Sequence, residues 1–379
     1  MSRQPGPARV LHCHSTFAAG GKELRSVKLM NALGGALDHA VVSGDPGETG
    51  ARAHLGRDVK VRFPQDFPAL RGFPSPGRLV AIAEAMKGYD LVLTYNWGAM
   101  DAVMAHTVFA AHFGLPPLIH HEDGFNEDEV DELKTRRNWY RRVALGRTHR
   151  LVVPSERLER IAREVWKMPP ARLARIPNGI DTARFAKPPE PGPFRVVKRE
   201  GERWVGTLAG LRPVKQLGQL VRAMSALGEQ WHLVIIGEGP ERDRIRAVAD
   251  ELDMSHRVHL PGAHPDPAKV IGLFDIFALS SRSEQFPLSV VEAMAAGLPV
   301  AAPDVGDIRA MVAEANRPFI CVADDWQALA QMLRDLAAEP DLCAEIGAAN
   351  RARARGQYDE AAMVARYREL YGEALGREL

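Results

Sequence analysis

The sequence predicts an α/β protein made of two doubly wound domains, each with a parallel sheet and helices on both of its faces. Three observations support this prediction. Short apolar segments alternate with amphipathic helical segments along almost the whole chain, which is typical of βαβ units. The length of 379 residues is more than one ordinary hydrophobic core organises. A proline-rich segment interrupts the alternation near the middle of the chain.

The first half contains five segments of the length and composition expected of buried strands. We expect these strands at 9–14, 39–43, 90–95, 117–121 and 151–154. Helical patterns lie between them, for example at 22–33 and 99–113. This succession predicts a parallel sheet in the first domain.

The second half repeats the same succession. We expect strands at 204–209, 233–236, 258–260, 276–279, 299–302 and 319–322, and helices at 240–252, 288–296 and 326–336. The turn signal Pro177-Asn178-Gly179 and the linker AKPPEPGPF separate the halves, so we place the boundary between residues 184 and 185. The tail at 357–379 is expected to form one more amphipathic helix.

Composition excludes several classes of protein. The 49 Lys and Arg residues balance 48 Asp and Glu residues, and the net charge of +1 gives no global field for nucleic acid. Cys13, Cys321 and Cys343 form no C-x-x-C pair, so we expect neither a disulfide framework nor a zinc site. No signal peptide and no apolar run long enough to span a bilayer occur, so we expect a cytoplasmic protein, at most peripheral to the inner face of the membrane.

The segment 280–300, SSRSEQFPLSVVEAMAAGLPV, carries the most specific pattern in the chain. A strand ends near its start, and Pro287 is suited to the first position of a helix. The N–H groups of Leu288 and Ser289 would then bind a diphosphate, helped by the helix dipole. Glu292 would lie about one helical turn after the diphosphate-binding N–H groups, where its carboxylate could accept hydrogen bonds from both ribose hydroxyls. Glu284 would precede the helix, where a group attached beyond the diphosphate would lie.

This segment resembles the E-x(7)-E region of the retaining family-four glycosyltransferases. The usual form is S-x-x-E-G-F-x-L-x-x-x-E-A-M-A-x-G-x-P-V, and this chain keeps Phe286 but has Gln285 in place of the glycine. The segments LVIIGEGPERDRI, FDIFALSS, IPNGIDTARF and QYDEAAMVARYRELY resemble other parts of the same family. The first domain is less similar to the family than the second.

The resemblance implies a GT-B fold, in which two Rossmann-like domains face each other and the helix at 357–379 crosses back to the first domain. It implies that residues 185–356 bind a nucleotide-sugar donor and that residues 1–184 read the acceptor. UDP is the first candidate carrier and GDP the second. The acceptor would be a glycan, a glycolipid or a lipid-linked molecule of envelope polysaccharide or glycoconjugate synthesis. The transfer would retain anomeric configuration and would use neither a metal nor another cofactor.

Further donor residues of the second domain are implied by the same resemblance. The segment GTLAGLRPVKQLGQL offers Arg212 and Lys215 to neutralise the leaving diphosphate, although the spacing departs from the family and Thr207 replaces its arginine. Gly237 follows the second strand of this half in a G-x-G-P turn that we assign to donor binding. A dinucleotide fingerprint is an alternative for this turn, but Arg242 stands where its third glycine belongs.

In the first domain, Gly20 and Gly21 form a glycine turn that in this family lines the donor site. His120 and His121 end a predicted strand, which is where ligands bind in open α/β sheets. The family has one histidine at this strand end, touching the donor sugar. We favour His121 as the catalytic residue and keep His120 as the alternative, because adjacent strand residues point to opposite faces.

Two neighbouring segments have weaker interpretations. Glu122 and Asp123 are candidates for binding acceptor hydroxyls. The basic segment 131–150 surrounds Trp139 and Tyr140 with arginines, which fits either a solvated helix or a helix lying on an anionic membrane.

Two alternatives to a glycosyltransferase remain at this stage. A nucleotide-sugar epimerase can share the GT-B fold, and it would turn over the donor without an acceptor. A nucleotide-sugar-binding protein with a decayed active site is the other alternative, because Thr207 and Gln285 depart from the family pattern.

Overall fold

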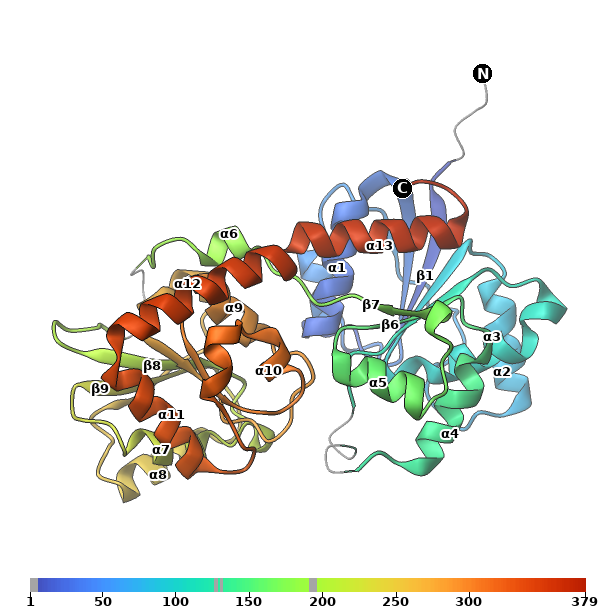
Figure 1. Ribbon diagram of the computed structural model, residues 1–379. Helices are drawn as coiled ribbons and strands as arrows, with labels where there is room; N and C mark the ends of the chain where they lie inside the picture. Colours follow the sequence, from blue (N-terminus) through green and yellow to red (C-terminus); the bar gives the residue numbers. More distant parts are fainter. Residues whose placement is uncertain (1–5, 126–128, 130–131, 191–195) are drawn as a thin grey trace. The chain divides into compact units, whose positions relative to one another are not determined.

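The computed structural model describes residues 6–125, 129, 132–190 and 196–379. The chain forms two compact units (Figure 1). Unit 1 contains residues 1–177 and 363–379, and unit 2 contains residues 178–362. Each unit is built on a fully parallel sheet, which confirms the predicted fold class. The last part of the expected linker, residues 191–195, lies outside the described residues.

The sheet of unit 1 has seven strands in the order β3-β2-β1-β4-β5-β6-β7. The strands are β1 (Ala8–His14), β2 (Leu37–Ser43), β3 (Val61–Arg62), β4 (Leu91–Tyr95), β5 (Leu118–His121), β6 (Arg150–Val153) and β7 (Leu173–Arg175). The short strands β3 and β7 were not expected from the sequence, because two or three residues carry no periodic signal. Both lie at the edges of the sheet, where they extend the pairing of β2 and β6.

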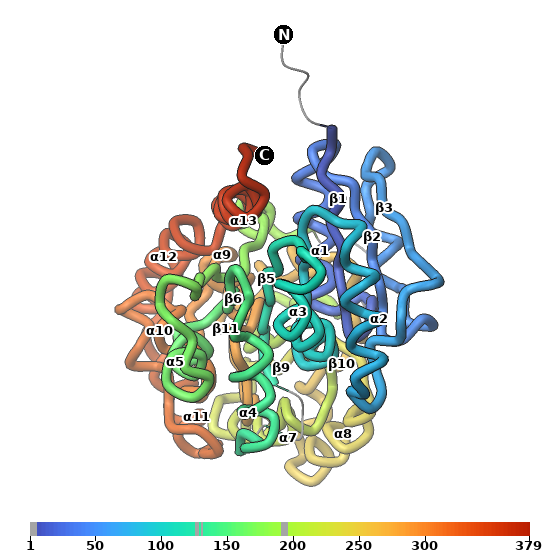
Figure 2. The backbone as a smooth tube through the Cα atoms, turned by 90° about the vertical axis from the view of Figure 1, so that its right-hand side faces the viewer, coloured from blue at the N-terminus to red at the C-terminus, as the bar shows by residue number. Residues whose placement is uncertain are grey.

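Helices cover both faces of this sheet. They are α1 (Gly21–Leu33), α2 (Pro76–Met86), α3 (Met100–Phe113), α4 (Thr135–Ala144), α5 (Glu156–Glu164) and α13 (Glu360–Leu375). The apolar residues of α1 and α13 share one buried cluster with the sheet. Those of α2, α3 and α5 and of the end of α4 share another. Helices α2 and α3 lie side by side (Figures 1 and 2).

The sheet of unit 2 has six strands in the order β10-β9-β8-β11-β12-β13. They are β8 (Arg203–Leu208), β9 (Trp231–Ile236), β10 (Val258–Gly262), β11 (Ile276–Ala278), β12 (Val300–Pro303) and β13 (Ile320–Cys321). The helices are α6 (Thr182–Phe185), α7 (Leu217–Met224), α8 (Arg242–Glu251), α9 (Leu288–Ala296), α10 (Ile308–Met311), α11 (Trp326–Ala338) and α12 (Pro340–Gln357). All six predicted strands are present, and α9 has the predicted bounds.

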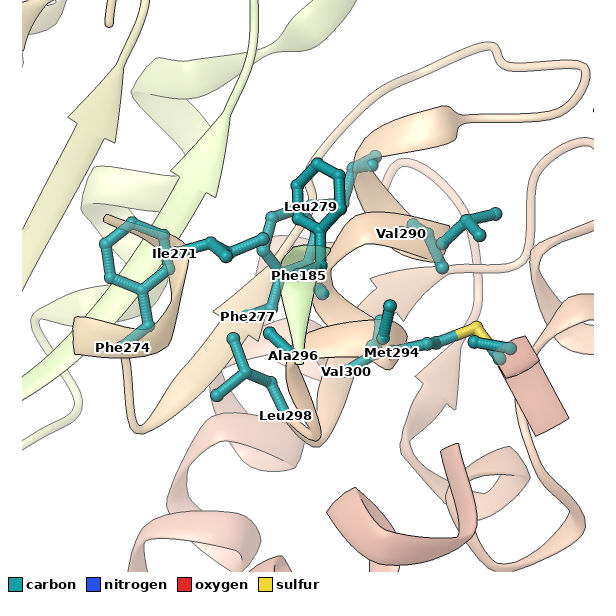
Figure 3. Packing of buried hydrophobic residues seen from close by; sticks show 14 of the residues in the cluster. Phe185, Ile271, Phe274, Phe277, Leu279, Val290, Met294, Ala296, Leu298 and Val300 are labelled. Carbon is teal, nitrogen blue, oxygen red and sulfur yellow. The ribbon is translucent and has the colours of Figure 1, made fainter. Parts of the chain in front are cut away.

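The core of unit 2 fixes the position of α9. Val290 and Met294 of this helix pack with Phe277 and Val300 of the neighbouring strands (Figure 3). Every residue named is fully buried. Because α9 is held by its apolar side, the start of the helix has one position relative to the strand ends. This matters because Glu284 and Glu292 lie just before and within α9.

Close packing around β8 requires a residue without a side chain at Gly206. A Cβ atom at this position would overlap the ring of Phe274, which closes the core at the same place (Figure 3). We expect Gly206→Ala to lower the stability of unit 2 by about 1–3 kcal/mol, because a packed core resists an added methyl group. The measurement is the midpoint of thermal unfolding.

Gly218→Ala is the matched control. Its Cβ would lie 3.5 Å from Val248, an ordinary contact, and residue 218 lies within α7. The control should leave the midpoint unchanged or raise it, because alanine favours the helix by about 0.5–1 kcal/mol. Equal midpoints for Gly206→Ala and the wild type would contradict the packing argument.

Candidate active site

Two loops meet at the carboxyl end of the sheet in unit 2. The first follows β8 and contains the short 3₁₀ helix η7 (Pro213–Lys215), and the second runs from β11 to α9. The Nζ atom of Lys215 lies 2.5 Å from Oε1 of Glu284. Ser281 donates a hydrogen bond of 2.7 Å to the same carboxylate oxygen. The structure therefore brings together two of the predicted site residues, and it adds Ser281, which the sequence analysis missed.

Backbone contacts hold these two loops in register. Ser280 donates from its hydroxyl to the carbonyl oxygen of Lys215 at 2.9 Å. The backbone N–H of Arg282 donates to the carbonyl of Val214, also at 2.9 Å. The Lys215–Glu284 contact is thus a built feature of the strand ends, because backbone bonds on either side fix both loops. The side chains of Lys215 and Glu284 are only 16% and 12% exposed.

The start of α9 continues this site. The helix begins at Leu288, and Pro287 is its N-cap residue rather than its first helical residue as predicted. Leu288, Ser289 and Glu292 are half-buried. The first turn of a helix directs its N–H groups outward along the axis, which makes it suited to an anion. Phe286 packs edge-to-face on Tyr358 at 5.5 Å between ring centroids, which fixes the chain just before the helix.

The remaining predicted donor residues of unit 2 are less tightly organised around the Lys215–Glu284 pair. Arg212 is exposed at the N-cap of η7. Gly237 lies in the turn after β9, where a Cβ atom would overlap the carbonyl oxygen of Ala209. Gly237 therefore permits the loops after β8 and β9 to approach each other. Gln285 accepts a hydrogen bond from the N–H of Asp307 through its carbonyl oxygen.

In unit 1, the glycine turn at Gly20 and Gly21 opens α1, with Gly20 as the N-cap. A Cβ atom at Gly20 would lie 2.7 Å from a carboxylate oxygen of Glu23. Glu23 is buried in the first helical turn and pairs with Lys22 at 2.6 Å. The space that glycine leaves at position 20 is therefore filled by the carboxylate of Glu23, a residue that the sequence analysis did not single out.

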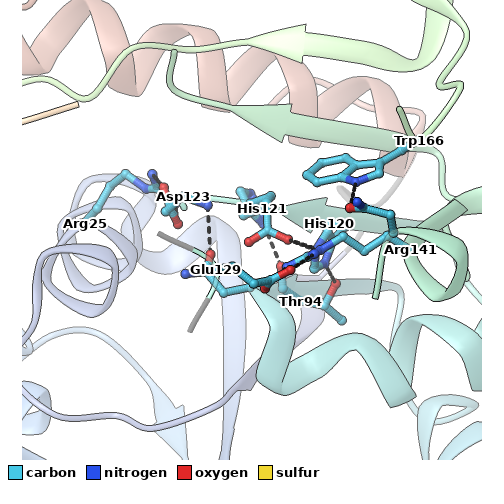
Figure 4. Close-up of polar contacts among 11 residues, drawn as sticks. Arg25, Thr94, His120, His121, Asp123, Glu129, Arg141 and Trp166 are labelled. Atoms are coloured by element: carbon cyan, nitrogen blue, oxygen red, sulfur yellow. Dashed lines mark hydrogen bonds and ion pairs between the residues drawn. The ribbon is translucent and has the colours of Figure 1, made fainter. Parts of the chain in front are cut away.

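His121 lies at the end of β5, on the face covered by α13 (Figure 4). Its Nδ1 atom lies 3.2 Å from the carbonyl oxygen of Thr94, so Nδ1 must carry the proton of this hydrogen bond. Tyr371 of α13 lies 3.2 Å from Nε2 and donates to it. The ring stacks on Tyr95 at 4.6 Å. Burial lowers the pKa of His121 well below its ordinary value, so the ring is neutral.

His120 lies one residue earlier, in a different set of contacts (Figure 4). Its Nδ1 atom is 2.8 Å from the hydroxyl oxygen of Thr94. Its Nε2 atom is 3.8 Å from the carboxylate of Glu122 and makes no hydrogen bond within the described part of the chain. Both nitrogens of His121 are engaged, whereas Nε2 of His120 is not. Both rings are buried, so the choice between His121 and the alternative, His120, as the histidine that touches a sugar stays a prediction.

Glu122 and Asp123 are already paired with buried arginines. Arg25 of α1 donates to both carboxylate oxygens of Asp123. Arg141 of α4 donates from Nε to Glu122 at 3.3 Å. Arg141 was expected on a solvated or membrane-facing helix surface, but this expectation is wrong, because its side chain is fully buried. The arginines leave Glu122 and Asp123 oriented by the fold rather than directed freely toward solvent.

The fold and the site define a GT-B glycosyltransferase, and comparison with known proteins supports this class. Residues 192–353 match the family model for glycosyl transferases group 1. Residues 19–184 match the model for glycosyltransferase family 4. Together the two models cover most of the chain, and we conclude that the protein belongs to the family-4 glycosyltransferases.

Known relatives are about one quarter identical to this chain within the aligned regions. A GDP-mannose-dependent alpha-mannosyltransferase of Mycolicibacterium smegmatis is 28% identical over 291 residues, which are 73% of this chain and 72% of the relative. N-acetyl-alpha-D-glucosaminyl L-malate synthase of Bacillus anthracis is 25% identical over 46% of this chain and 47% of its own length. This chain therefore spans about half the length of that relative. It likewise matches 52% of the length of a second relative, a mannosyltransferase.

Solved structures extend the similarity of fold over nearly the whole chain. Anabaena Alr3699/HepE in complex with UDP superposes with a TM-score of 0.79, covers 96% of this chain and 100% of its own, and is 18% identical. Sucrose-phosphate synthase of Thermosynechococcus elongatus gives a TM-score of 0.77 at 21% identity, over 97% and 99% of the two chains.

The buried histidines of unit 1 predict a pH dependence of its stability. Burial lowers the pKa of His12, His14 and His121 well below the ordinary value, and it lowers the pKa of His39 to about 4. An unfolded histidine takes up a proton near pH 6.5. As the pH falls below this value, these histidines bind protons in the unfolded chain but stay neutral in folded unit 1. The free energy of unfolding therefore decreases.

Each such histidine removes up to about 1.4 kcal/mol per pH unit within this window. Scanning calorimetry at pH 7.5, 6.5 and 5.5 should show the transition of unit 1 moving to lower temperature, and His39→Gln should reduce the slope. A transition that stays in place between pH 7.5 and 5.5 would show that these rings are not kept neutral.

Proposed function

We propose that this protein is a retaining, metal-independent hexosyltransferase that moves a sugar from a nucleoside diphosphate to an acceptor hydroxyl. The observation that supports this proposal is the Lys215–Glu284 pair beside the start of α9, with Glu292 in the same helix. One cation, one helix N-terminus and two carboxylates are the groups that a nucleotide sugar requires. The N-terminus of α9 and Lys215 would hold the diphosphate, Glu292 the ribose and Glu284 the transferred sugar.

In this reaction the bond between the anomeric carbon and the diphosphate oxygen breaks, and a bond to the acceptor oxygen forms on the same face. The proton of the acceptor hydroxyl passes to the leaving diphosphate. Negative charge that develops on the diphosphate is stabilised by Lys215 and by the helix dipole. Arg212, an exposed residue three positions before Lys215, adds a second positive charge. These fixed charges supply the stabilisation that a divalent cation provides in other enzymes, so no metal is needed.

The Lys215–Glu284 contact implies that the donor rearranges these two side chains when it binds. A diphosphate carries more charge than a single carboxylate and would compete with Glu284 for Lys215. When Lys215 turns to the diphosphate, Glu284 becomes available to accept hydrogen bonds from sugar hydroxyls, while Ser281 keeps it in place. A nucleotide sugar would satisfy both residues at once, whereas a bare nucleotide would satisfy only the lysine.

UDP is our first candidate for the nucleotide and GDP the second. Relatives are named for both carriers: a GDP-mannose-dependent alpha-mannosyltransferase, and a UDP-Gal:alpha-D-GlcNAc-diphosphoundecaprenol alpha-1,3-galactosyltransferase of Escherichia coli. We propose a glycan, a glycolipid or a lipid-linked acceptor, as in envelope polysaccharide synthesis. Within the described residues, no helix has the length and apolar character needed to cross a bilayer.

We further propose that α4 brings unit 1 to the inner face of an anionic membrane. Trp139 and Val143 are 61% and 53% exposed on this helix, and Arg136 and Arg142 are exposed beside them. The guanidinium of Arg142 lies 5.3 Å from the ring of Trp139. Exposed aromatic and aliphatic side chains among arginines suit the headgroup region of anionic lipids. Position 131, at the start of the basic segment, lies outside the described residues.

The division of roles between the two glutamates is testable by calorimetric titration. Glu292→Ala should weaken the binding of bare UDP or GDP by about tenfold or more, because a hydrogen-bonded carboxylate contributes about 1.5–3 kcal/mol. Glu284→Ala should leave bare-nucleotide binding equal or tighter, since Lys215 is released, and should lose the added affinity of the sugar. Equal effects of both changes on both ligands would contradict the assignment.

Membrane contact is testable by flotation with vesicles. The double variant Arg136→Glu/Arg142→Glu should lose binding to phosphatidylglycerol vesicles, because each basic residue near the surface contributes about 1 kcal/mol. Arg244→Glu/Arg246→Glu is the charge-matched control, since both residues are exposed on α8 in unit 2. Equal flotation of the two double variants would show that α4 is not the membrane-binding surface.

A further inference from the structure

Arg141 occupies a buried aromatic site in unit 1 that neither the fold nor the donor site requires. Its guanidinium carbon lies 4.9 Å from the ring centre of Trp97 and 5.3 Å from those of Phe125 and Trp166. The side chain is fully buried. A surface helix normally turns its arginines outward, as α4 does with Arg142. The inward direction of the Arg141 side chain therefore needs a structural explanation.

Two carboxylates on the segment that follows β5 provide that cause. Arg141 donates through Nη1 and Nη2 to both oxygens of Glu129, at 3.1 and 3.3 Å. It donates through Nε to Oε2 of Glu122 at 3.3 Å. Arg137 adds a bond of 2.9 Å to Glu129. One guanidinium thus contacts both Glu122 and Glu129, and Figure 4 labels Glu129 beside Arg141.

Two arginines, Arg137 and Arg141, face two glutamates, Glu122 and Glu129, in this cluster. Burial raises the pKa of Glu129, but hydrogen bonds from Arg141 and Arg137 outweigh burial and lower that pKa below its ordinary value. Glu129 is therefore expected to be ionised opposite the two arginines, and Glu122 pairs with the same guanidinium of Arg141. Removing one partner from a buried pair of this kind is strongly destabilising, so the pairing favours one arrangement of the two carboxylates around Arg141. Glu122 is then held with Oε2 3.8 Å from Nε2 of His120.

We propose that Arg141 is a positioning residue, which holds the Glu122 carboxylate beside His120 and thereby fixes His120 as the tautomer protonated on Nε2. A negative carboxylate facing Nε2 favours a proton on that nitrogen. Thr94 completes the arrangement, because its hydroxyl lies 2.8 Å from Nδ1 and can donate to it. The N–H of His120 then faces Glu122 in the buried end of β5, whereas His121 has its proton on Nδ1.

The role of this N–H rests on the proposed function. A fixed tautomer and a fixed carboxylate keep the end of β5 in one arrangement, and a preorganised strand end avoids reorientation during the reaction. Loss of the fixed tautomer should lower kcat while leaving the binding of bare nucleotide to unit 2 unchanged. The tautomer itself is a property of unit 1 and can be measured without any substrate.

The experiment is nitrogen–proton correlation NMR of the full chain labelled with ¹⁵N-histidine, with His120→Asn used to assign the His120 signals. In the wild type, Nε2 of His120 should give the signal of a protonated ring nitrogen and Nδ1 that of a bare one. Glu122→Gln keeps the shape but removes the charge, and Arg141→Met releases Glu122. Both variants should move population to the Nδ1-protonated form, and Thr94→Val should do the same.

Arg142→Met is the matched control, because Arg142 is the next residue but is exposed. It should leave the His120 signals unchanged. An unchanged His120 tautomer in folded Glu122→Gln would overturn the proposal, and would leave the cluster with a purely structural role. Glu122→Gln and Thr94→Val also decide the question if Arg141→Met does not fold.

A second readout separates this proposal from the proposed function. With the nucleotide sugar that the wild type hydrolyses fastest among UDP- and GDP-linked hexoses, kcat of Glu122→Gln and Arg141→Lys should fall by about tenfold to a hundredfold, with donor KM unchanged. If the wild type hydrolyses none of them, the proposed function fails while the NMR result still stands. If the tautomer shifts but kcat does not, the assigned role of His120 is wrong.

Discussion

The ion pair between Lys215 and Glu284 is the contact on which the proposed donor site depends, because it joins the loops that follow two adjacent strands, β8 and β11. Backbone bonds from Arg282 and a hydroxyl bond from Ser280 make the same connection at the main chain. The packing of α9 on the sheet then fixes the position of the helix start, four residues after Glu284 in the sequence. In the proposed reaction, an entering donor would meet a cation and a carboxylate that already neutralise each other, so its binding would exchange one ion pair for another.

Unit 1 satisfies its charges at the strand ends in the same way. Asp123 pairs with Arg25 of α1, and Glu122 pairs with Arg141 of α4. Between these pairs, His121 is hydrogen-bonded to Tyr371 and His120 lies beside Glu122. Paired charges cost less to bury than isolated ones, and each pair also fixes a loop. The carboxyl ends of both parallel sheets are thus organised by ion pairs that join one loop to another element.

The sequence predicted the features that depend on local pattern. Alternating strands and helices, the bounds of α9 and the class of the protein all followed from periodicity and from one motif of 21 residues. The strands β3 and β7 were missed because they are too short to show a period. Arg141 was misread as a surface residue because its partners, Glu122 and Glu129, lie 19 and 12 positions away and no local pattern links them. The different surroundings of His120 and His121 could not be predicted for the same reason, since the face covered by α13 is a tertiary property.

Retention of configuration is the central claim about the chemistry, and a time course by proton NMR tests it most directly. The wild-type protein is incubated with UDP- and GDP-linked α-hexoses, and the first free sugar released is observed before it mutarotates. A retaining mechanism predicts that this sugar is the α anomer and that its release is slower in Glu292→Ala. Initial release of the β anomer, or an epimerised donor in place of released sugar, would contradict it.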